Sequence, residues 1–221
     1  MDKKNSQIIK ILKKTYPDAK IALNYKTHIE LLVATILSAQ CTDKRVNIVT
    51  KDLFKKYNSL KDYANAKQSV FEKEIRSTGF YRNKARNIIG AAKMILKDFK
   101  GEVPQSMEEL LKLPGVARKT ATVVLSHAFN KIEGITVDTH VIRLSQRLGF
   151  SKNKDAVKIE QDLINLFPKN SWFILPHLLI SHGRKTCIAR NPKCPECALQ
   201  KLCPYYKSIQ QNSLYTIKSH G

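Results

Sequence analysis

Residues 113–121 read LPGVARKTA and predict a tight turn between two short helices. The first helix is expected to begin at a capping box made by Ser106 and Glu109, and the second to run from about Arg118 to Phe129. Gly115 can supply a positive φ in the turn, and the backbone N–H groups at the start of the second helix then point outward. Such N–H groups can bind a phosphate, which positions a nucleic-acid backbone without reading its sequence. An ordinary corner between two helices is the alternative interpretation.

The residues on both sides of this turn also follow helical periodicity. Upstream, Thr27 and Glu30 form another capping box ahead of an apolar run, and Gly101 is expected in the C′ position after a helical stripe. Downstream, a helix is expected to end at Gly149, and Pro176 marks a kink or the first turn of a later helix. No segment alternates with a period of two for long enough to predict a sheet. The sequence therefore predicts an all-α fold.

The chain is strongly basic, with 39 basic and 18 acidic residues and a formal net charge of +21. Such an excess favours a polyanionic partner, of which nucleic acid is the commonest. Because 30 of the basic residues are lysine, the bias of an A/T-rich genome is the alternative explanation. The apolar runs are too short to span a bilayer, and the opening residues MDKKNSQIIK lack the apolar core of a secretory signal. A cytoplasmic protein without a membrane partner is expected.

Four of the five cysteines, Cys187, Cys194, Cys197 and Cys203, follow the spacing C-x6-C-x2-C-x5-C. Four thiolates at short range bind zinc or an iron–sulfur cluster. Zinc ribbons usually contain two separated CxxC pairs, whereas this segment contains one, flanked by longer arms. Cys41 is distant in sequence and is expected to be a small core residue. The basic residues around the first two ligands, which a metal-bound loop would present to a nucleic-acid backbone, are Arg184, Lys185, Arg190 and Lys193.

Two charged residues have positions that suit sugar chemistry. Lys119 lies in the first turn of the helix after the hairpin, where the electropositive helix end disfavours an ammonium. A neutral amine can attack the anomeric carbon of a sugar and form a Schiff base. Asp138 lies between apolar residues just ahead of a helix, in the segment ITVDTHV. The simpler interpretations are that Lys119 is one of many solvated lysines and that Asp138 is an N-cap.

The combination of LPGVARKTA with VDTH resembles the endonuclease III family of DNA glycosylases, and the similarity extends over nearly the whole chain. The usual hairpin of that family reads LPGVGRKTA, so Ala117 replaces a glycine here. The resemblance implies that Lys119 is the nucleophile and that Asp138 activates it or stabilises the cationic sugar. It also implies that the four clustered cysteines hold a 4Fe-4S cluster with a structural role.

The same resemblance implies how a duplex would be bound and opened. SAQCTD at residues 38–43 is similar to the family's SAQATD, which makes Gln40 the residue that fills the space left by an extruded base. GFY at residues 79–81 is similar to the family's GLY, with Phe80 in place of a leucine wedge, and a core position is the alternative for Phe80. His140 is expected to contact a phosphate or line the pocket, with a structural role as the alternative. The hairpin residues implied in DNA binding are Leu113, Gly115 and Ala117.

The family resemblance further implies a two-lobed helix-hairpin-helix glycosylase fold. Residues 22–132 would form a six-helix barrel lobe, and residues 1–21 with 133–221 an iron–sulfur lobe, with Lys119 and Asp138 facing each other across a cleft. The implied function is base-excision repair, in which oxidised pyrimidines are removed from duplex DNA through a lysine Schiff base and the strand is cut by β-elimination. The expected partner is double-stranded DNA with damaged bases or abasic sites, bound by a monomer at the nucleoid.

Two other functions are alternatives. A monofunctional mismatch adenine glycosylase would share the fold and the cluster, but it would lack a lysine at the position of Lys119. It would also continue into a further domain, whereas this sequence ends at residue 221, soon after Cys203. A non-catalytic iron–sulfur DNA-binding protein would keep the hairpin without needing both Lys119 and Asp138.

Overall fold

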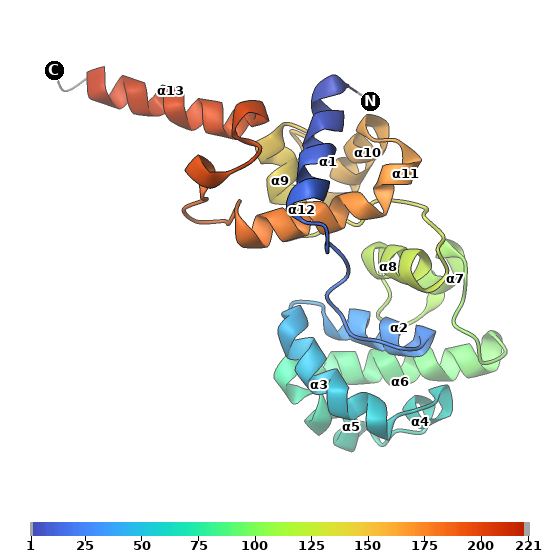
Figure 1. The fold of residues 1–221 in the computed structure, drawn as a ribbon. Coiled ribbons are helices and arrows are strands. Elements are labelled where there is room, and N and C mark those ends of the chain that lie inside the picture. Colours follow the sequence, from blue (N-terminus) through green and yellow to red (C-terminus); the bar gives the residue numbers. More distant parts are fainter. Residues whose placement is uncertain (1, 219–221) are drawn as a thin grey trace. The chain divides into compact units, whose positions relative to one another are not determined.

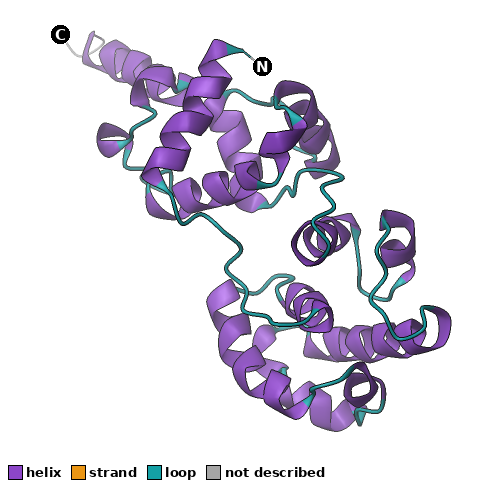
Figure 2. Cartoon of the chain, turned by 45° about the vertical axis from the view of Figure 1, so that its right-hand side comes forward, coloured by secondary structure: helices purple, strands orange, loops and turns teal. Residues whose placement is uncertain are grey.

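The computed structural model describes residues 2–218 of the chain, with side chains described through residue 211. Residues 1 and 219–221 of the expected iron–sulfur lobe lie outside the described residues. The described part consists of helices, turns and loops and contains no strand (Figure 2), which confirms the predicted all-α fold. No helix within residues 2–218 has the length and apolar character needed to cross a membrane.

The helices form two compact units, each with its own interior. One unit, here called the middle unit, is the continuous segment Ala22–Glu133. The other, here called the terminal unit, combines the residues up to Ile21 with those from Gly134 onward. Figure 1 labels the α-helices of both units in order along the chain, and the short 3-10 helices, named η here, lie between them.

The middle unit is built around a central helix and one long helix. Its elements are α2 (His28–Leu37), α3 (Asp43–Lys56), α4 (Leu60–Ala64), α5 (Gln68–Glu74), η1 (Arg76–Thr78), α6 (Tyr81–Asp98), α7 (Met107–Lys112) and α8 (Arg118–Ala128). Every residue from Leu31 to Leu37 in α2 is buried, because α3, α6 and α8 all pack against this helix. The long helix α6 carries α4 and α5 along its side, and α7 packs against α8.

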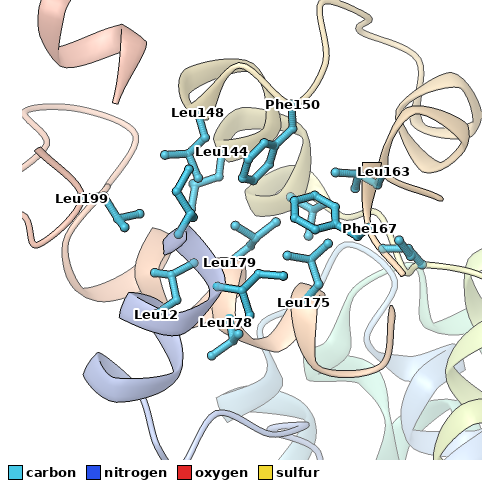
Figure 3. Packing of buried hydrophobic residues seen from close by; sticks show 14 of the residues in the cluster. Leu12, Leu144, Leu148, Phe150, Leu163, Phe167, Leu175, Leu178, Leu179 and Leu199 are labelled. Atoms are coloured by element: carbon cyan, nitrogen blue, oxygen red, sulfur yellow. The ribbon is translucent and has the colours of Figure 1, made fainter. Parts of the chain in front are cut away.

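The terminal unit is built around α12, against which α1, α9 and α11 pack. Its elements are α1 (Lys3–Thr15), α9 (Thr139–Leu148), α10 (Ala156–Leu166), α11 (Lys169–Trp172), α12 (Ile174–Lys185), η2 (Cys194–Glu196), η3 (Gln200–Leu202) and α13 (Pro204–Lys218). Figure 3 shows its apolar core, where Leu12 from α1, Leu144 from α9 and Leu179 from α12 belong to one buried cluster. The first helix of the chain is therefore part of a core made mostly by the last third of the sequence.

Several predicted boundaries are confirmed by local hydrogen bonds. Thr27 caps α2 in a complete capping box with Glu30, and Gly149 ends α9 with a φ of +77°. Pro176 lies in the first turn of α12, as one of the two predicted alternatives has it, and α12 begins directly after α11 because Phe173 between them keeps helical angles. At the end of α6, Gly101 is one residue later than predicted, because Lys100 takes the first left-handed position with a φ of +53°. The C′ prediction for Gly101 is thus wrong by one residue.

Replacing Leu12 by Ala should destabilise the terminal unit. Leu12 is 1% exposed in the core of that unit, so the substitution removes buried apolar contacts and leaves a cavity. We expect a loss of about 2–5 kcal/mol in the free energy of unfolding, measured by urea titration with circular dichroism. The exposed neighbour Lys13→Ala is the control and should change the free energy by about 0.5 kcal/mol or less. Equal effects of the two substitutions would show that α1 is not anchored as described.

Candidate functional site

The predicted hairpin is the turn between α7 and α8. Leu113 is the C-cap of α7 and is 2% exposed, and its carbonyl accepts a hydrogen bond from Val116 N over 3.1 Å. Gly115 has a φ of +77°, and a Cβ added there would lie 2.7 Å from the Cβ of Asn87 on α6. Only glycine satisfies both the backbone angle and the space, because a side chain would be strained and would collide with α6.

Ala117, which stands where the family pattern has glycine, is the N-cap of α8 with a φ of −91°. An alanine adopts this extended backbone without strain, so the departure from the pattern leaves the hairpin intact. Ala117 gives the helix no side-chain cap, so the N-terminal end of α8 is available to an external acceptor. Lys119 is the second residue of α8, and its side chain is exposed beside the hairpin.

Asp138, in the terminal unit, is the N-cap of α9. Its Oδ1 accepts a hydrogen bond from Val141 N over 2.8 Å, so the capping interpretation of this residue is confirmed. The side chain is half-buried, and the adjacent Val137 is 9% exposed. An N-cap does not exclude a catalytic role, because the carboxylate has a second oxygen. His140, two residues later, is half-buried with its Nδ1 3.2 Å from Nη2 of Arg143.

Two arginines of α9 connect this helix to the segment that begins the cysteine cluster. Arg143 donates hydrogen bonds to the carbonyls of Gly183 (3.0 Å) and Cys187 (3.1 Å). Arg147 donates to the carbonyl of Ile188 over 2.9 Å and approaches the Sγ of Cys187 at 3.3 Å. Neither arginine was predicted as a functional residue from the sequence. Their spacing of four places them on one face of α9, a signal that could have marked them as an inward-facing pair.

The four clustered cysteines line one pocket. Cys187, Cys194, Cys197 and Cys203 border a space of about 340 Å³, open solvent included, together with His182 and Tyr205. Burial raises the pKa of the Cys197 thiol, and burial and the neighbouring Cys187 and Cys203 raise the pKa of Cys194. A bound cation would offset this mutual repulsion of thiolates. Among the described residues, no three His, Cys, Asp or Glu side chains are arranged to hold a single metal ion.

One side of this pocket is closed by a buried histidine. His182 is 3% exposed, and its Nε2 lies 3.6 Å from the Sγ of Cys197. Its Nδ1 hydrogen-bonds with the Tyr16 hydroxyl (2.9 Å), which also hydrogen-bonds with Thr186 (2.8 Å). Burial lowers the pKa of His182 to about 4. A chain of polar contacts therefore joins the N-terminal segment to the cysteine pocket, and the pocket is consistent with an iron–sulfur cluster.

The basic residues predicted around the first two cysteines are all exposed. Arg184 and Lys185 end α12, and Arg190 and Lys193 lie in the loop between Cys187 and Cys194. The ammonium of Lys185 lies 5.7 Å from the centre of the Tyr16 ring. These four side chains are thus presented at the surface beside the pocket.

The two predicted wedge residues both have a positive φ angle. Gln40 and Phe80 are non-glycine residues with φ values of +51° and +47°. Gln40 is exposed and Phe80 is 62% exposed, so the alternative of a core position for Phe80 is wrong. Cys41 is only half-buried, so its predicted place in the core is also wrong.

A family model, relatives in sequence and solved structures are similar to this chain. Residues 33–169 match the HhH-GPD superfamily base excision DNA repair protein family. Endonuclease III of Synechocystis is 56% identical over 90% of this chain and 91% of its own, and that of Bacillus subtilis is 49% identical over 85% and 86%. A solved structure of a trapped covalent intermediate between endonuclease III and DNA has a TM-score of 0.87 and 45% identity, and it covers 95% of this chain and 100% of its own.

The superfamily model matches more than half of the chain, and the similarity to bacterial relatives extends over nearly its full length. Both findings agree with the presence of the hairpin and the cysteine pocket. The chain belongs to the endonuclease III family of helix-hairpin-helix base excision DNA repair enzymes.

Proposed function

We propose that this chain is a bifunctional DNA glycosylase and abasic-site lyase that removes oxidised pyrimidines from duplex DNA, with Lys119 as the nucleophile. The observation that carries this proposal is the exposed lysine in the first turn of α8, directly after a hairpin suited to a phosphate. A related endonuclease III has been trapped in a covalent intermediate with DNA, which is the species that an attacking amine would give.

The reaction divides base removal and strand cleavage into connected steps. The Nζ lone pair of Lys119 attacks C1′ of the damaged nucleotide, and the bond from C1′ to the base breaks with its electron pair going to the base, which leaves as it takes up a proton. The lysine nitrogen then loses a proton, the C1′–O4′ bond breaks and O4′ takes up a proton, which opens the sugar ring and gives a Schiff base at C1′. Loss of a proton from C2′ breaks the C3′–O bond and expels the 3′ phosphate. Water hydrolyses the remaining imine and frees Lys119.

Asp138 is proposed to support the charges that arise in the first step. Its carboxylate can accept the proton that Lys119 loses, and it can stabilise the positive charge that develops on the sugar. Since Oδ1 is used to cap α9, Oδ2 is assigned to this role. His140 is proposed to contact a phosphate nearby.

The four cysteines are proposed to hold a 4Fe-4S cluster. Four thiolates around one pocket can each bind one iron, and Arg147 and His182 place hydrogen-bonding groups beside the Sγ atoms of Cys187 and Cys197. When bound, the cluster supplies cross-links between parts of the loop and takes no part in the bond changes. It would hold the exposed Arg190 and Lys193 in a fixed position for the DNA backbone.

The DNA-binding surface is proposed to have two parts with different roles. The hairpin residues Leu113, Gly115 and Ala117 and the basic residues Arg184, Lys185, Arg190 and Lys193 bind phosphates. Gln40 and Phe80 enter the base stack and fill the space of the extruded nucleotide. The chain is proposed to act as a monomer in the cytoplasm, where bacterial chromosomal DNA lies.

The first test separates the roles of Lys119 and Asp138. Lys119→Gln should abolish base release and borohydride-trapped adducts while damaged duplex still binds, because a Schiff base requires an amine. Asp138→Asn should slow base release by roughly 10²–10⁴-fold with little loss of stability, since Asn also caps helices. Nicking at a pre-formed abasic site should suffer less from Asp138→Asn. The exposed Lys97→Gln on α6 is the control. A trapped adduct at full yield in Lys119→Gln would assign the nucleophile to another amine.

The second test concerns the metal. The purified protein should be yellow-brown and contain iron and inorganic sulfide in near-equal amounts, whereas colourless protein with one zinc would contradict the cluster. Cys194→Ser should lose the colour and lower the melting temperature, because ligand loss removes metal-coupled folding energy. Cys41→Ser removes the fifth cysteine, which lies outside the pocket, and should change neither the colour nor the iron content.

The third test concerns the phosphate contacts. Binding to duplex DNA should weaken steeply as salt rises, because bound counterions are released. Lys193→Ala should weaken binding to damaged and intact duplex alike, by about 1 kcal/mol or less, and reduce the salt slope by about 1. Lys97→Ala should leave both quantities unchanged. If Lys193→Ala altered lesion selectivity but left non-specific binding intact, a backbone contact at Lys193 would be excluded.

A further inference from the structure

Lys84 is a buried lysine that no step described above uses. It lies in the first turn of α6 and is 4% exposed. Its Nζ donates hydrogen bonds to two backbone carbonyls, of Leu37 and of Thr78, each over 2.8 Å. Burial lowers the pKa of this ammonium. Lysine is rarely so buried, because removal of the ammonium from water is costly unless it is well hydrogen-bonded. A role that requires a cation here would explain why an apolar residue does not occupy the position.

The two acceptors lie just ahead of the two predicted wedge residues. Leu37 is the last residue of α2 and precedes Gln40 by three residues, and Thr78 ends η1 and precedes Phe80 by two. The backbone N–H of Lys84 also donates to the carbonyl of Phe80 over 3.0 Å. Lys84 therefore links the loop that follows α2 to the loop that precedes α6 by hydrogen bonds.

Both wedge residues need such support. Gln40 and Phe80 adopt positive φ angles that cost free energy in residues with a side chain, and such angles persist only where the surroundings hold them. The Gln40 turn is also closed by a hydrogen bond from Cys41 N to Ser38 O over 3.1 Å. The side chains of Gln40 and Phe80 project from the surface and do not pack into the core.

We propose that Lys84 is a positioning residue for nucleotide extrusion, because its ammonium fixes the Gln40 turn to the Phe80 turn so that both side chains enter the duplex as one rigid unit. This inference rests on the proposed function, since it assigns work to Lys84 only if Gln40 and Phe80 open the base stack. Extrusion of a well-paired base requires unstacking and unpairing, and a base that is already unpaired requires less of both. The contribution of Lys84 should therefore depend on how firmly the lesion is stacked.

The test compares substrates that differ in the work of extrusion. Lys84→Met keeps an unbranched apolar stem, one atom shorter than the lysine side chain, but removes the donors. In single-turnover reactions it should slow excision from a fully paired duplex by roughly tenfold to hundredfold, as expected when wedges are misplaced. The loss should be several times smaller when the lesion lies in a mismatched bubble, and smallest for nicking at a pre-formed abasic site. Ile95→Ala, fully buried further along α6, is the control and should affect the three substrates equally or not at all.

A second readout follows extrusion without chemistry. In the Lys119→Gln background, 2-aminopurine placed beside the lesion should brighten on binding as it unstacks, and adding Lys84→Met should reduce this rise at equal occupancy. In a Gln40→Ala, Phe80→Ala background, Lys84→Met should cause no further slowing, because the residues it positions are already gone. A full additional loss in that background would overturn the proposal, as would an equal loss on all three substrates.

Two further results keep the inference separate from the function on which it rests. If the wild-type protein released no base, the proposed function itself would fail, whereas an active wild type with a uniform Lys84→Met defect would reject only the role of Lys84. If Lys84→Met did not fold, Lys84→Gln would replace it. Its shorter amide keeps donors and should show the same order of substrates with smaller losses, and the absence of that order would again overturn the proposal.

Discussion

The terminal unit depends on two arginine side chains that satisfy backbone carbonyls where α12 ends. The last carbonyls of a helix have no partner within it and carry partial negative charge, so they favour a cation. Arg143 donates to the carbonyl of Gly183 in the last turn of α12, and the two arginines together also donate to the carbonyls of Cys187, Ile188 and Ala189 in the loop that follows. Both arginines project from α9, the helix that Asp138 caps. One short helix therefore fixes the start of the cysteine loop at one end and the carboxylate of Asp138, for which a catalytic role is proposed, at the other.

The helices α9 and α12 approach each other closely at Gly183. A Cβ added to Gly183 would lie 2.9 Å from both Arg143 Nη2 and His140 Nδ1. Glycine at this position lets the guanidinium reach the backbone, so packing and hydrogen bonding at this contact depend on each other. In the middle unit, Gly115 has the same relation to Asn87 of α6. In both units a predicted functional segment, the hairpin at Gly115 or the end of α12 at Gly183, packs closely against another helix because the glycine has no side chain.

Local sequence signals predicted much of this structure, and long-range contacts account for what they missed. The turn at Gly115 and the cap at Thr27 were predictable because each depends on neighbours within a few residues. The short helices α4 and α5 were not anticipated, since five to seven residues give too little periodicity, although Ser59 and Asp62 form a capping box at α4. Lys84 could not be recognised from the sequence, because its acceptors Leu37 and Thr78 lie on other segments.

The discontinuous course of the terminal unit has a consequence for synthesis on the ribosome. The middle unit is one continuous segment, so it can fold as soon as its residues have emerged. Ile8 and Leu12, on the apolar face of α1, belong to a core whose other helices follow residue 134. These side chains therefore remain exposed while the middle unit folds. The cysteines that line the pocket are made later still. Insertion of the proposed cluster therefore has to follow synthesis of the chain through Cys203, when α1 and the other elements of its core are all present.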